Sequence, residues 1–426
     1  MKTKLYNAKV LHKDMSITDG GLCVKDDTIM CVFEGDKCDN NKECVFDREI
    51  DCKGNLLMPS FKNAHTHSAM TFLRSRADDL PLHEWLQNQV WPLEGKLTPE
   101  HVYWFTKLAI LEYVSGGITA AFDMYMSPDS VASAAVDTGF RITLCGSVMD
   151  FDGDKALQNL QNCYKKYNEY NPLVAYKLGL HAEYTNSIDN LKAVAELSAE
   201  YKAPVYTHMS ETKAEHDGCY ERHGKSPAAL FAELGLWENG GGVFHAVHVD
   251  GNDMNIMATK NIWAISNPGS NLKLASGIAP LTQMQKAGVR IALGTDGAAS
   301  NNALSMFREM YFAVTLQKYL QNDAAACPAY NALEWAVSNS AKAIGLDDCD
   351  CIEPGKKADI VMIELDRPSM RPHNNIAKNI VYSGDTSVVK MTMANGKILY
   401  KNGEFFVGDS FRKIIEKCES LMKDFV

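Results

Sequence analysis

The sequence predicts an α/β protein, a (β/α)8 barrel of the TIM type with a small β-sandwich formed by the N- and C-terminal segments. Three observations predict this fold. Short apolar strands alternate with longer amphipathic helices between residues 58 and 352. The two flanking segments instead carry short strands interrupted by turn residues, as all-β structures do. No Gly-x-Gly-x-x-Gly follows the first alternating strand, which argues against a doubly wound dinucleotide-binding sheet.

The N-terminal segment, residues 1–57, is expected to form the first part of the sandwich. Its strand-like pieces are separated by Gly, Asp and Asn, the residues that favour tight turns. The expected strands are Lys2–Val10, Gly21–Val24 and Thr28–Glu34.

The central segment, residues 58–352, has the number and rhythm of elements that a closed eight-stranded barrel needs. Helical patterns such as Pro99–Gly116, Ser187–Tyr201 and Ser226–Leu234 separate the strands. The expected strands are Asn55–Ala64, Ile118–Met124, Arg141–Val148, Ala175–His181, Pro204–His208, Gly242–His245, Ile262–Ser266 and Val289–Gly294.

The C-terminal segment, residues 353–426, returns to the β pattern and is expected to complete the sandwich. Pro354–Ile363 contains a strand. Val388–Ala394 and Lys397–Tyr400 flank an Asn-Gly pair, which predicts a tight hairpin. Asp409–Val426 has the apolar spacing of an amphipathic helix.

The composition narrows the class of protein. Of the 426 residues, 46% are hydrophobic and 23% charged, as in ordinary soluble globular proteins. A net charge of -10 without clustered Lys and Arg argues against nucleic acid as a partner. No apolar run suits a membrane span or a signal peptide, so we expect a cytoplasmic protein with no membrane partner. The twelve scattered cysteines are then expected to be reduced thiols.

Two histidines close the first barrel strand, in Met58-Pro-Ser-Phe-Lys-Asn-Ala-His-Thr-His67. Alternate residues of a strand share a face, so His65 and His67 aim two imidazoles at one point. His208 ends the fifth expected strand and Asp296 the eighth. Because the carboxyl ends of barrel strands meet at one mouth, these four side chains are expected to bind one divalent ion, Zn²⁺ first and Fe²⁺ as the alternative.

Taken singly, each of these signals has a plainer explanation. A His-x-His pair arises by chance, a lone strand-end histidine is more often a hydrogen-bonded core residue, and Thr-Asp-Gly is more often a turn. The metal hypothesis depends on all four residues standing at strand ends in suitable barrel positions.

These motifs resemble those of the amidohydrolase superfamily, and the resemblance covers essentially the whole chain. The residues that carry it are Pro59-Ser-Phe-Lys-Asn-Ala-His-Thr-His67, Thr207-His-Met-Ser-Glu211, His245 of the sixth strand and Gly294-Thr-Asp-Gly-Ala-Ala-Ser-Asn301. Members with two metals usually bridge them with a carboxylated lysine at the end of the fourth strand. Lys177 stands four residues before His181, too deep in that strand to reach the mouth, so one metal ion is expected.

The resemblance also implies roles in proton transfer. Glu211, three residues after His208, matches the family's His-x-x-Glu and would shuttle a proton to a ring nitrogen. His245 would orient the attacking water, and Asp296 would accept a proton as well as bind metal. His248 is interpreted as structural. Without the resemblance, Glu211 would be taken as a solvated loop residue.

Within the superfamily, the chain is most similar to the 5′-methylthioadenosine / S-adenosylhomocysteine deaminases. The stretch from Ser68 to Glu94, which ends Val-Trp-Pro-Leu-Glu94, carries this likeness, together with Asn267-Pro-Gly-Ser-Asn-Leu-Lys-Leu274. The likeness implies that Glu94 binds the two ribose hydroxyls and that His181 reaches the purine. Trp85 and Trp91 offer apolar walls, although a Trp in an amphipathic helix is usually part of the core.

One departure from that family concerns the substrate's tail. Members that accept S-adenosylhomocysteine usually carry arginines after the third strand, whereas Leu144–Asp154 has none and contains three aspartates. We therefore expect 5′-methylthioadenosine or adenosine to be preferred, and we expect a homo-oligomer.

Three alternatives compete with the nucleoside deaminase. A deaminase of a free base such as guanine or cytosine, or a triazine hydrolase, would have no ribose for Glu94 to bind. A catalytically inactive member would have lost ligands that are present here. A cytidine-deaminase-like zinc enzyme would need His-x-Glu and Pro-Cys-x-x-Cys, which are absent.

Overall fold

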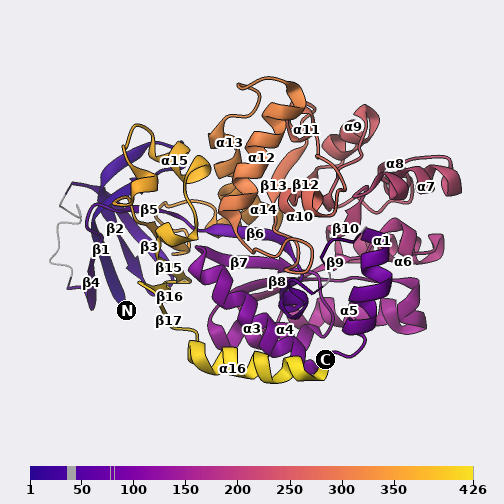
Figure 1. The fold of residues 1–426 in the computed structure, drawn as a ribbon, viewed down its shortest axis with the longest axis horizontal. Helices are drawn as coiled ribbons and strands as arrows, with labels where there is room; N and C mark the ends of the chain where they lie inside the picture. Colours follow the sequence, from indigo (N-terminus) through magenta and orange to yellow (C-terminus); the bar gives the residue numbers. More distant parts are fainter. Residues whose placement is uncertain (36–44, 77, 81, 426) are drawn as a thin grey trace.

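Eight parallel strands, paired in chain order, form the centre of the structure, a computed structural model that describes residues 1–35, 45–76, 78–80 and 82–425 (Figure 1). The sheet is the expected barrel, and its second to eighth strands overlap the apolar runs that predicted them. They are β6 (Phe61–Thr66), β7 (Ile118–Asp123), β8 (Arg141–Cys145), β9 (Val174–Gly179), β10 (Val205–Met209), β11 (Gly241–His245), β12 (Ile262–Ser266) and β13 (Arg290–Leu293).

The segment after β13 closes the barrel against β6. The backbone amides of Thr295 and Asp296 donate to the carbonyl oxygen of His65 at 3.1 and 3.0 Å. The Asn63 side chain bonds Thr295 twice, once to its hydroxyl and once to its amide. The closure therefore joins the first and eighth strands at their carboxyl ends, where the candidate ligands stand.

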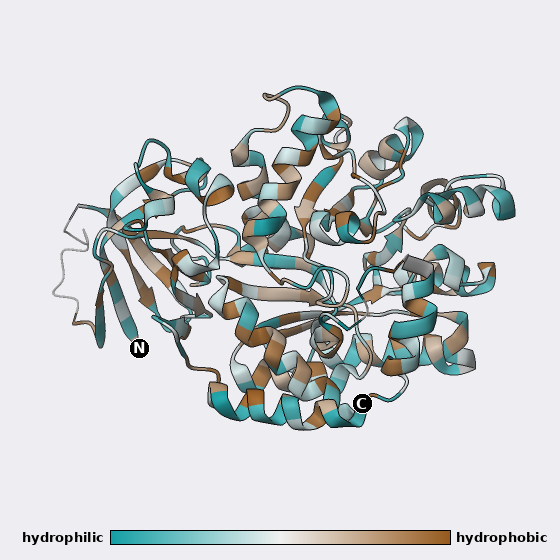
Figure 2. Cartoon of the chain, in the orientation of Figure 1, coloured by the Kyte–Doolittle hydropathy of each residue, from teal (hydrophilic) through white to brown (hydrophobic). Residues whose placement is uncertain are grey.

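Helices cover the outside of the barrel, with apolar faces turned inward and hydrophilic faces turned to solvent, and short helices such as α1, η2 and α2 (residues 82–94) lie at its mouth (Figure 2). They are η1 (Ser68–Leu73), α1 (Leu82–Trp85), η2 (Leu86–Val90), α2 (Trp91–Glu94), α3 (Pro99–Ser115), α4 (Pro128–Thr138), η3 (Asp150–Lys155), α5 (Ala156–Tyr167), η4 (Glu183–Thr185), α6 (Ile188–Tyr201), α7 (Lys213–His223), α8 (Pro227–Glu233), α9 (Gly251–Thr259), α10 (Pro268–Lys273), α11 (Leu281–Lys286), α12 (Met306–Gln321), α13 (Ala329–Glu334), η5 (Trp335–Asn339) and α14 (Ser340–Ala343).

The two ends of the chain together build one mixed sheet beside the barrel (Figure 1). Its order is β17-β16-β15-β14-β5-β1-β2-β3, and β4 also pairs with β1. These strands are β1 (Lys2–Leu11), β2 (Ile17–Lys25), β3 (Thr28–Glu34), β4 (Arg48–Asp51), β5 (Leu56–Pro59), β14 (Ile360–Ile363), β15 (Val389–Ala394), β16 (Lys397–Lys401) and β17 (Glu404–Phe405).

This terminal sheet folds back on itself around its own apolar core. The amide of Ile29 in β3 donates to Lys356 O, and Gly355 N donates to Ile29 O, both at 2.8 Å. Strand β3, at one edge of the sheet, therefore contacts the segment that precedes β14. Leu22 and Met391 are among the side chains buried between the layers. The expected hairpin forms between β15 and β16.

The first expected strand, Asn55–Ala64, is two strands that belong to different sheets. β5 pairs with β14 of the terminal sheet as far as Pro59, and after Ser60 the chain pairs with β7 as the first barrel strand. Proline has no amide hydrogen, which makes Pro59 a natural end to the ladder. The change of sheet therefore falls between Pro59 and Phe61.

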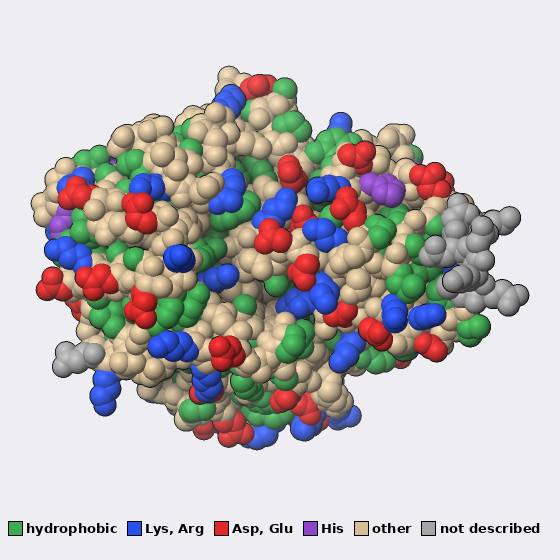
Figure 3. All heavy atoms as spheres, turned by 180° about the vertical axis from the view of Figure 1, so that it is seen from behind, with side chains coloured by type: hydrophobic (Ala, Val, Ile, Leu, Met, Phe, Trp, Pro, Cys, Tyr) green, Lys and Arg blue, Asp and Glu red, His purple; other side chains and the backbone are tan. Residues whose placement is uncertain are grey.

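Short helices complete the C-terminal part: η6 (Asp347–Cys349), η7 (Pro368–Met370), α15 (Ile376–Tyr382), η8 (Thr386–Val388), α16 (Phe411–Leu421) and η9 (Met422–Phe425). The α16 helix lies along α3 at the edge of the barrel, where Lys107 donates to Asp409 at 2.6 Å (Figure 1). Basic and acidic side chains are interspersed over the face seen in Figure 3. None of the described helices is long and apolar enough to cross a membrane.

Candidate functional site

Four histidines and one aspartate from the ends of four strands, β6, β10, β11 and β13, meet at the carboxyl end of the barrel. The imidazole of His65 lies 4.9 Å from those of His67 and His208, and 5.7 Å from that of His245, between ring centroids. Oδ1 of Asp296 lies 3.6 Å from His65 Nε2 and 3.3 Å from His67 Nε2. The predicted ligands are thus brought to one point.

The cluster offers two overlapping sets of donor atoms for a cation. His65, His67 and Asp296 form one set and His65, His208 and His245 the other, with the ligand atoms of each set within 4.8 Å of one another. His245, for which sequence reasoning expected a catalytic role, therefore lies within reach of the same position as His208.

His65 provides the test of whether a metal fits. Its side chain is fully buried, and neither ring nitrogen has a hydrogen-bond partner among the described residues. An unpaired buried polar group costs about 1–3 kcal/mol, so the site is complete only when something pairs with it. Burial holds the pKa of His65 well below its ordinary value, which keeps the imidazole neutral and able to donate an electron pair to a cation.

Hydrogen bonds at the far ring nitrogen orient three of the imidazoles. His67 Nδ1 bonds Met124 O at 2.6 Å, His208 Nδ1 bonds His181 O at 2.8 Å, and His245 Nδ1 bonds Asn271 Oδ1 at 2.8 Å. Such bonds leave Nε2 facing the cluster and are the usual support of metal-binding histidines.

Hydrogen bonds also orient the carboxylate of Asp296. Its Oδ2 accepts hydrogen bonds from the hydroxyls of Ser270 and Ser300, both at 2.6 Å. Although burial opposes ionisation, the neighbouring His67 holds the pKa of Asp296 well below its usual range. The backbone of Asp296 has a φ of 59° and that of His245 a φ of 73°. Left-handed backbone at non-glycine residues is strained, and here it aims two strand-end side chains into the mouth.

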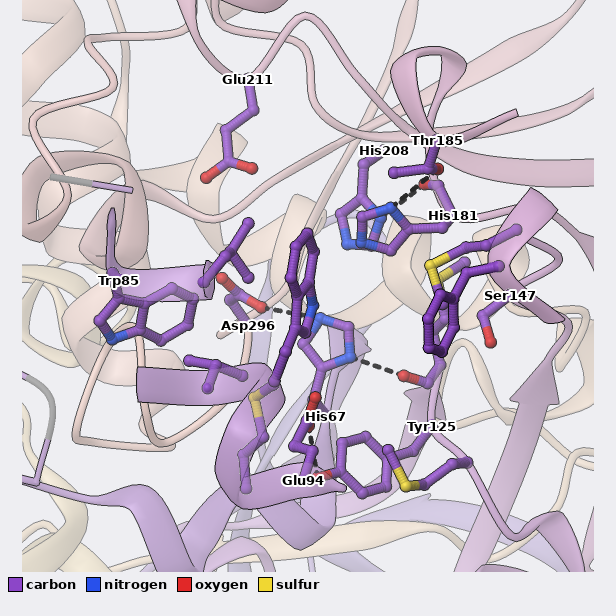
Figure 4. Close-up of a pocket in the computed structure, with 18 of the residues that line it drawn as sticks. His67, Trp85, Glu94, Tyr125, Ser147, His181, Thr185, His208, Glu211 and Asp296 are labelled. Carbon is purple, nitrogen blue, oxygen red and sulfur yellow. Dashed lines mark hydrogen bonds and ion pairs between the residues drawn. The ribbon is translucent and has the colours of Figure 1, made fainter. Parts of the chain in front are cut away.

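A cavity of about 760 Å³ opens beside this cluster (Figure 4). The residues expected to bind substrate all line it: Trp85, Trp91, Glu94, His181 and Glu211. Trp85 is buried and Trp91 is 40% exposed, so they contribute an inner and an outer wall. Burial lowers the pKa of His181 to about 4, which leaves this imidazole uncharged near the cluster.

The carboxyl groups of Glu211 and Glu94 enter the cavity from opposite sides (Figure 4). Oε2 of Glu211 lies 3.7 Å from His245 Nε2. Burial raises the pKa of both carboxyls above the ordinary value. A raised pKa favours the protonated form, which suits Glu211 to deliver a proton.

Several residues of the site were not found from the sequence. Tyr125 donates to Glu94 Oε1 at 2.6 Å, and Ser270, Ser300 and Asn271 hold Asp296 and His245. Their residue types are common and no local spacing marks them. Ser270, Asn271 and Ser300 lie within stretches that carry the family resemblance, and this is the signal that could have found them.

Lys177 faces the opposite end of the barrel. It lines a separate cavity of about 560 Å³ with Gly241, Trp263 and Arg290, which stand at the amino ends of their strands. His248, interpreted as structural, bonds Ser276 O through Nε2 at 2.8 Å. The site at the carboxyl end therefore includes neither residue.

Comparison with known proteins agrees with this fold. The amidohydrolase family matches residues 56–399. A 5-methylthioadenosine/S-adenosylhomocysteine deaminase from Thermoanaerobacter pseudethanolicus is 40% identical over 392 residues, covering 91% of each chain.

Two solved structures with zinc have closely similar folds. An adenosine deaminase from Xanthomonas campestris superposes with a TM-score of 0.93 at 29% identity, covering 100% of this chain and 98% of that one. An atrazine chlorohydrolase from Arthrobacter aurescens superposes with a TM-score of 0.88 at 20% identity, covering 99% and 100%. The family match over residues 56–399 and the 40% identical relative lead to one conclusion: the chain belongs to the amidohydrolase family of enzymes.

Proposed function

We propose that this enzyme hydrolyses the 6-amino group of an adenosine-type nucleoside, giving the inosine analogue and ammonia. One observation carries the proposal: a single cavity has the cluster of histidines and Asp296 on one side and the Glu94–Tyr125 pair on the other. A nucleoside presents the two matching groups, an amidine carbon and a vicinal diol. The name of the 40% identical relative supports the same substrate class.

His65, His67, His208 and Asp296 would hold one divalent cation, Zn²⁺ in our proposal, because three imidazoles and one carboxylate suit it. When bound, the cation supplies positive charge that lowers the pKa of water and so provides a nucleophile near neutral pH. With Lys177 at the other end of the barrel, no described lysine lines the cavity to bridge a second ion.

The chemical steps depend on Glu211, His245 and Asp296. Glu211 gives a proton to the purine ring nitrogen as water adds to C6, so that negative charge does not build on the ring. His245 holds the oxygen that attacks, and Asp296 accepts the proton that this oxygen loses. Asp296 passes this proton to the exocyclic nitrogen, which leaves as neutral ammonia, and the other proton of the water returns to Glu211 and restores its acid form.

The outer part of the cavity favours an uncharged 5′ tail. Among the described residues that line it there is no Lys or Arg, while Asp152 stands beside Met149 and Phe151. The carboxylate of S-adenosylhomocysteine would approach Asp152 without a cation to pair with. We therefore place 5′-methylthioadenosine and adenosine ahead of S-adenosylhomocysteine as substrates.

The test is a deamination panel followed by the loss of absorbance near the adenine maximum. It compares 5′-methylthioadenosine, adenosine, S-adenosylhomocysteine, guanine and cytosine. We expect kcat/KM for methylthioadenosine to exceed that for S-adenosylhomocysteine by about tenfold, or about 1.4 kcal/mol. A higher kcat/KM for S-adenosylhomocysteine would defeat the tail assignment. Faster turnover of a free base would support the base deaminase instead.

A further inference from the structure

The carboxyl of Glu211 enters the cavity from a short turn between β10 and α7. Ser210, the residue before it, has a left-handed backbone with a φ of 51°. The carbonyl of Ser210 is held by the amides of Val247 and His248, at 3.1 and 2.9 Å. One side of this turn is thus attached to the segment that follows β11, just beyond His245.

Two backbone amides of the same turn donate hydrogen bonds to a single carboxylate, that of Glu215. Ser210 N donates to Oε1 and Glu211 N donates to Oε2, both at 2.8 Å. Glu215 stands in the first turn of α7, where its own amide is capped by the Thr212 hydroxyl at 3.2 Å. Its residue exposure is only 8%, and it does not line the cavity.

We propose that Glu215 is a positioning residue that acts through Glu211. Its two oxygens hold two consecutive amides, which fixes the Cα of Glu211 and hence the direction of the carboxyl. The proposal rests on the proposed function for the reaction that Glu211 serves. Glutamine could not replace Glu215, because its single oxygen accepts from one amide while its NH₂ group would face the other N–H.

The first experiment is a double-mutant cycle with 5′-methylthioadenosine as substrate. We expect Glu215→Gln to lower kcat about 10- to 100-fold, since a small misplacement of a catalytic group costs that much, with KM within about twofold. If Glu215 acts through Glu211, the double variant with Glu211→Gln is no slower than Glu211→Gln alone. An unchanged kcat in Glu215→Gln, or a double variant slowed by the product of the single effects, overturns the proposal.

The second experiment does not depend on activity. Amide hydrogen exchange of Ser210 and Glu211 is expected to be slow in the native protein and faster in Glu215→Gln. Exchange at the native rate in the variant overturns the proposal. A wild-type enzyme inactive on every nucleoside would refute the proposed function, while the exchange result would still decide whether Glu215 holds the turn.

The matched control is Asp253→Asn. Asp253 stands in the first turn of α9, is 1% exposed, and accepts from the amide of Asp250 and the hydroxyl of Ser226, but it does not line the cavity. This variant should lose stability without the change in kcat. If Glu215→Gln fails to fold, Glu215→Asp, which keeps both oxygens on a shorter side chain, is expected to retain more activity than Glu215→Ala. Equal activity of those two variants counts against the proposal.

Discussion

The hydroxyl of Tyr125 donates a hydrogen bond of 2.6 Å to Oε1 of Glu94, across a sequence separation of 31 residues. Tyr125 follows β7, whereas Glu94 ends α2 in the segment that follows β6. The bond therefore ties together two loops at the mouth of the barrel. In the proposed function it also orients the carboxylate that receives the ribose.

Replacing Tyr125 with Phe should weaken ribose binding without touching the chemistry. A hydrogen bond to a charged group contributes about 1.5–3 kcal/mol, so KM for the nucleoside should rise at least about tenfold, with kcat within about twofold. Steady-state kinetics measure this. Tyr184→Phe, which alters another tyrosine of the cavity wall, is the control and should behave as wild type. A fall in kcat at constant KM would speak against the role of Tyr125.

Glu94→Gln should discriminate nucleosides from free bases. One carboxylate accepts from two vicinal hydroxyls, and an amide can accept at only one of its two ends. KM should rise about 100-fold for 5′-methylthioadenosine and little for adenine, if adenine is turned over at all. Equal losses on both compounds would show that Glu94 does not recognise ribose.

Asp152→Asn should shift the preference between the 5′ tails of S-adenosylhomocysteine and 5′-methylthioadenosine. Asp152 lies at the exposed rim, so solvent screening limits its effect, and we expect the kcat/KM ratio of S-adenosylhomocysteine to methylthioadenosine to rise about threefold. Asp150→Asn removes a carboxylate two positions away that bonds Ser187 and Asn190, outside the cavity, and should leave the ratio unchanged. A ratio that stays constant in Asp152→Asn would argue that charge at the rim does not select the tail.

Removal of the divalent cation should abolish activity and lower the thermal midpoint. A ligand that binds only the folded state stabilises it by RT ln(1 + [L]/Kd), about 2.7 kcal/mol at 100 times Kd. Chelation followed by titration with Zn²⁺, monitored by calorimetry, measures the effect. His208→Asn should lose the Zn²⁺-dependent rise, and His248→Asn should keep it. A midpoint insensitive to Zn²⁺ in the wild type would contradict the metal site.

The carboxyl of Glu309 should make stability depend on pH. It is fully buried, accepts Gly269 N and Asn301 Nδ2 at 2.8 Å each, and burial raises its pKa from 4.5 to about 7. A raised folded-state pKa stabilises the fold below pH 4.5, and this contribution is lost as pH rises to about 7. Relative to Glu309→Gln, the wild type should lose about 3 kcal/mol over that interval. Denaturation curves at several pH values test this, and a constant difference would contradict it.

The barrel strands could be predicted because each is an apolar run of the right length between helical patterns, a signal local in sequence. The candidate ligands could be predicted for a related reason. His65, His67, His208 and Asp296 stand at or just beyond strand ends, and parallel closure brings all such ends to one mouth. Glu94, Glu211 and His245 needed the resemblance to a known family, because their local patterns are ordinary.

The sequence by itself therefore determined the fold, the family and which side chains meet at the mouth of the barrel. Only the tertiary structure decided what supports them. These supports are the hydrogen bond from Tyr125 to Glu94, the hydrogen bonds from the Ser210 and Glu211 amides to Glu215, and the change of sheet at Ser60. Strand and helix periodicities are repeated along the chain and can be counted. A hydrogen bond between two common residues on separate loops leaves no periodic trace, because it depends on where the finished barrel places their backbones.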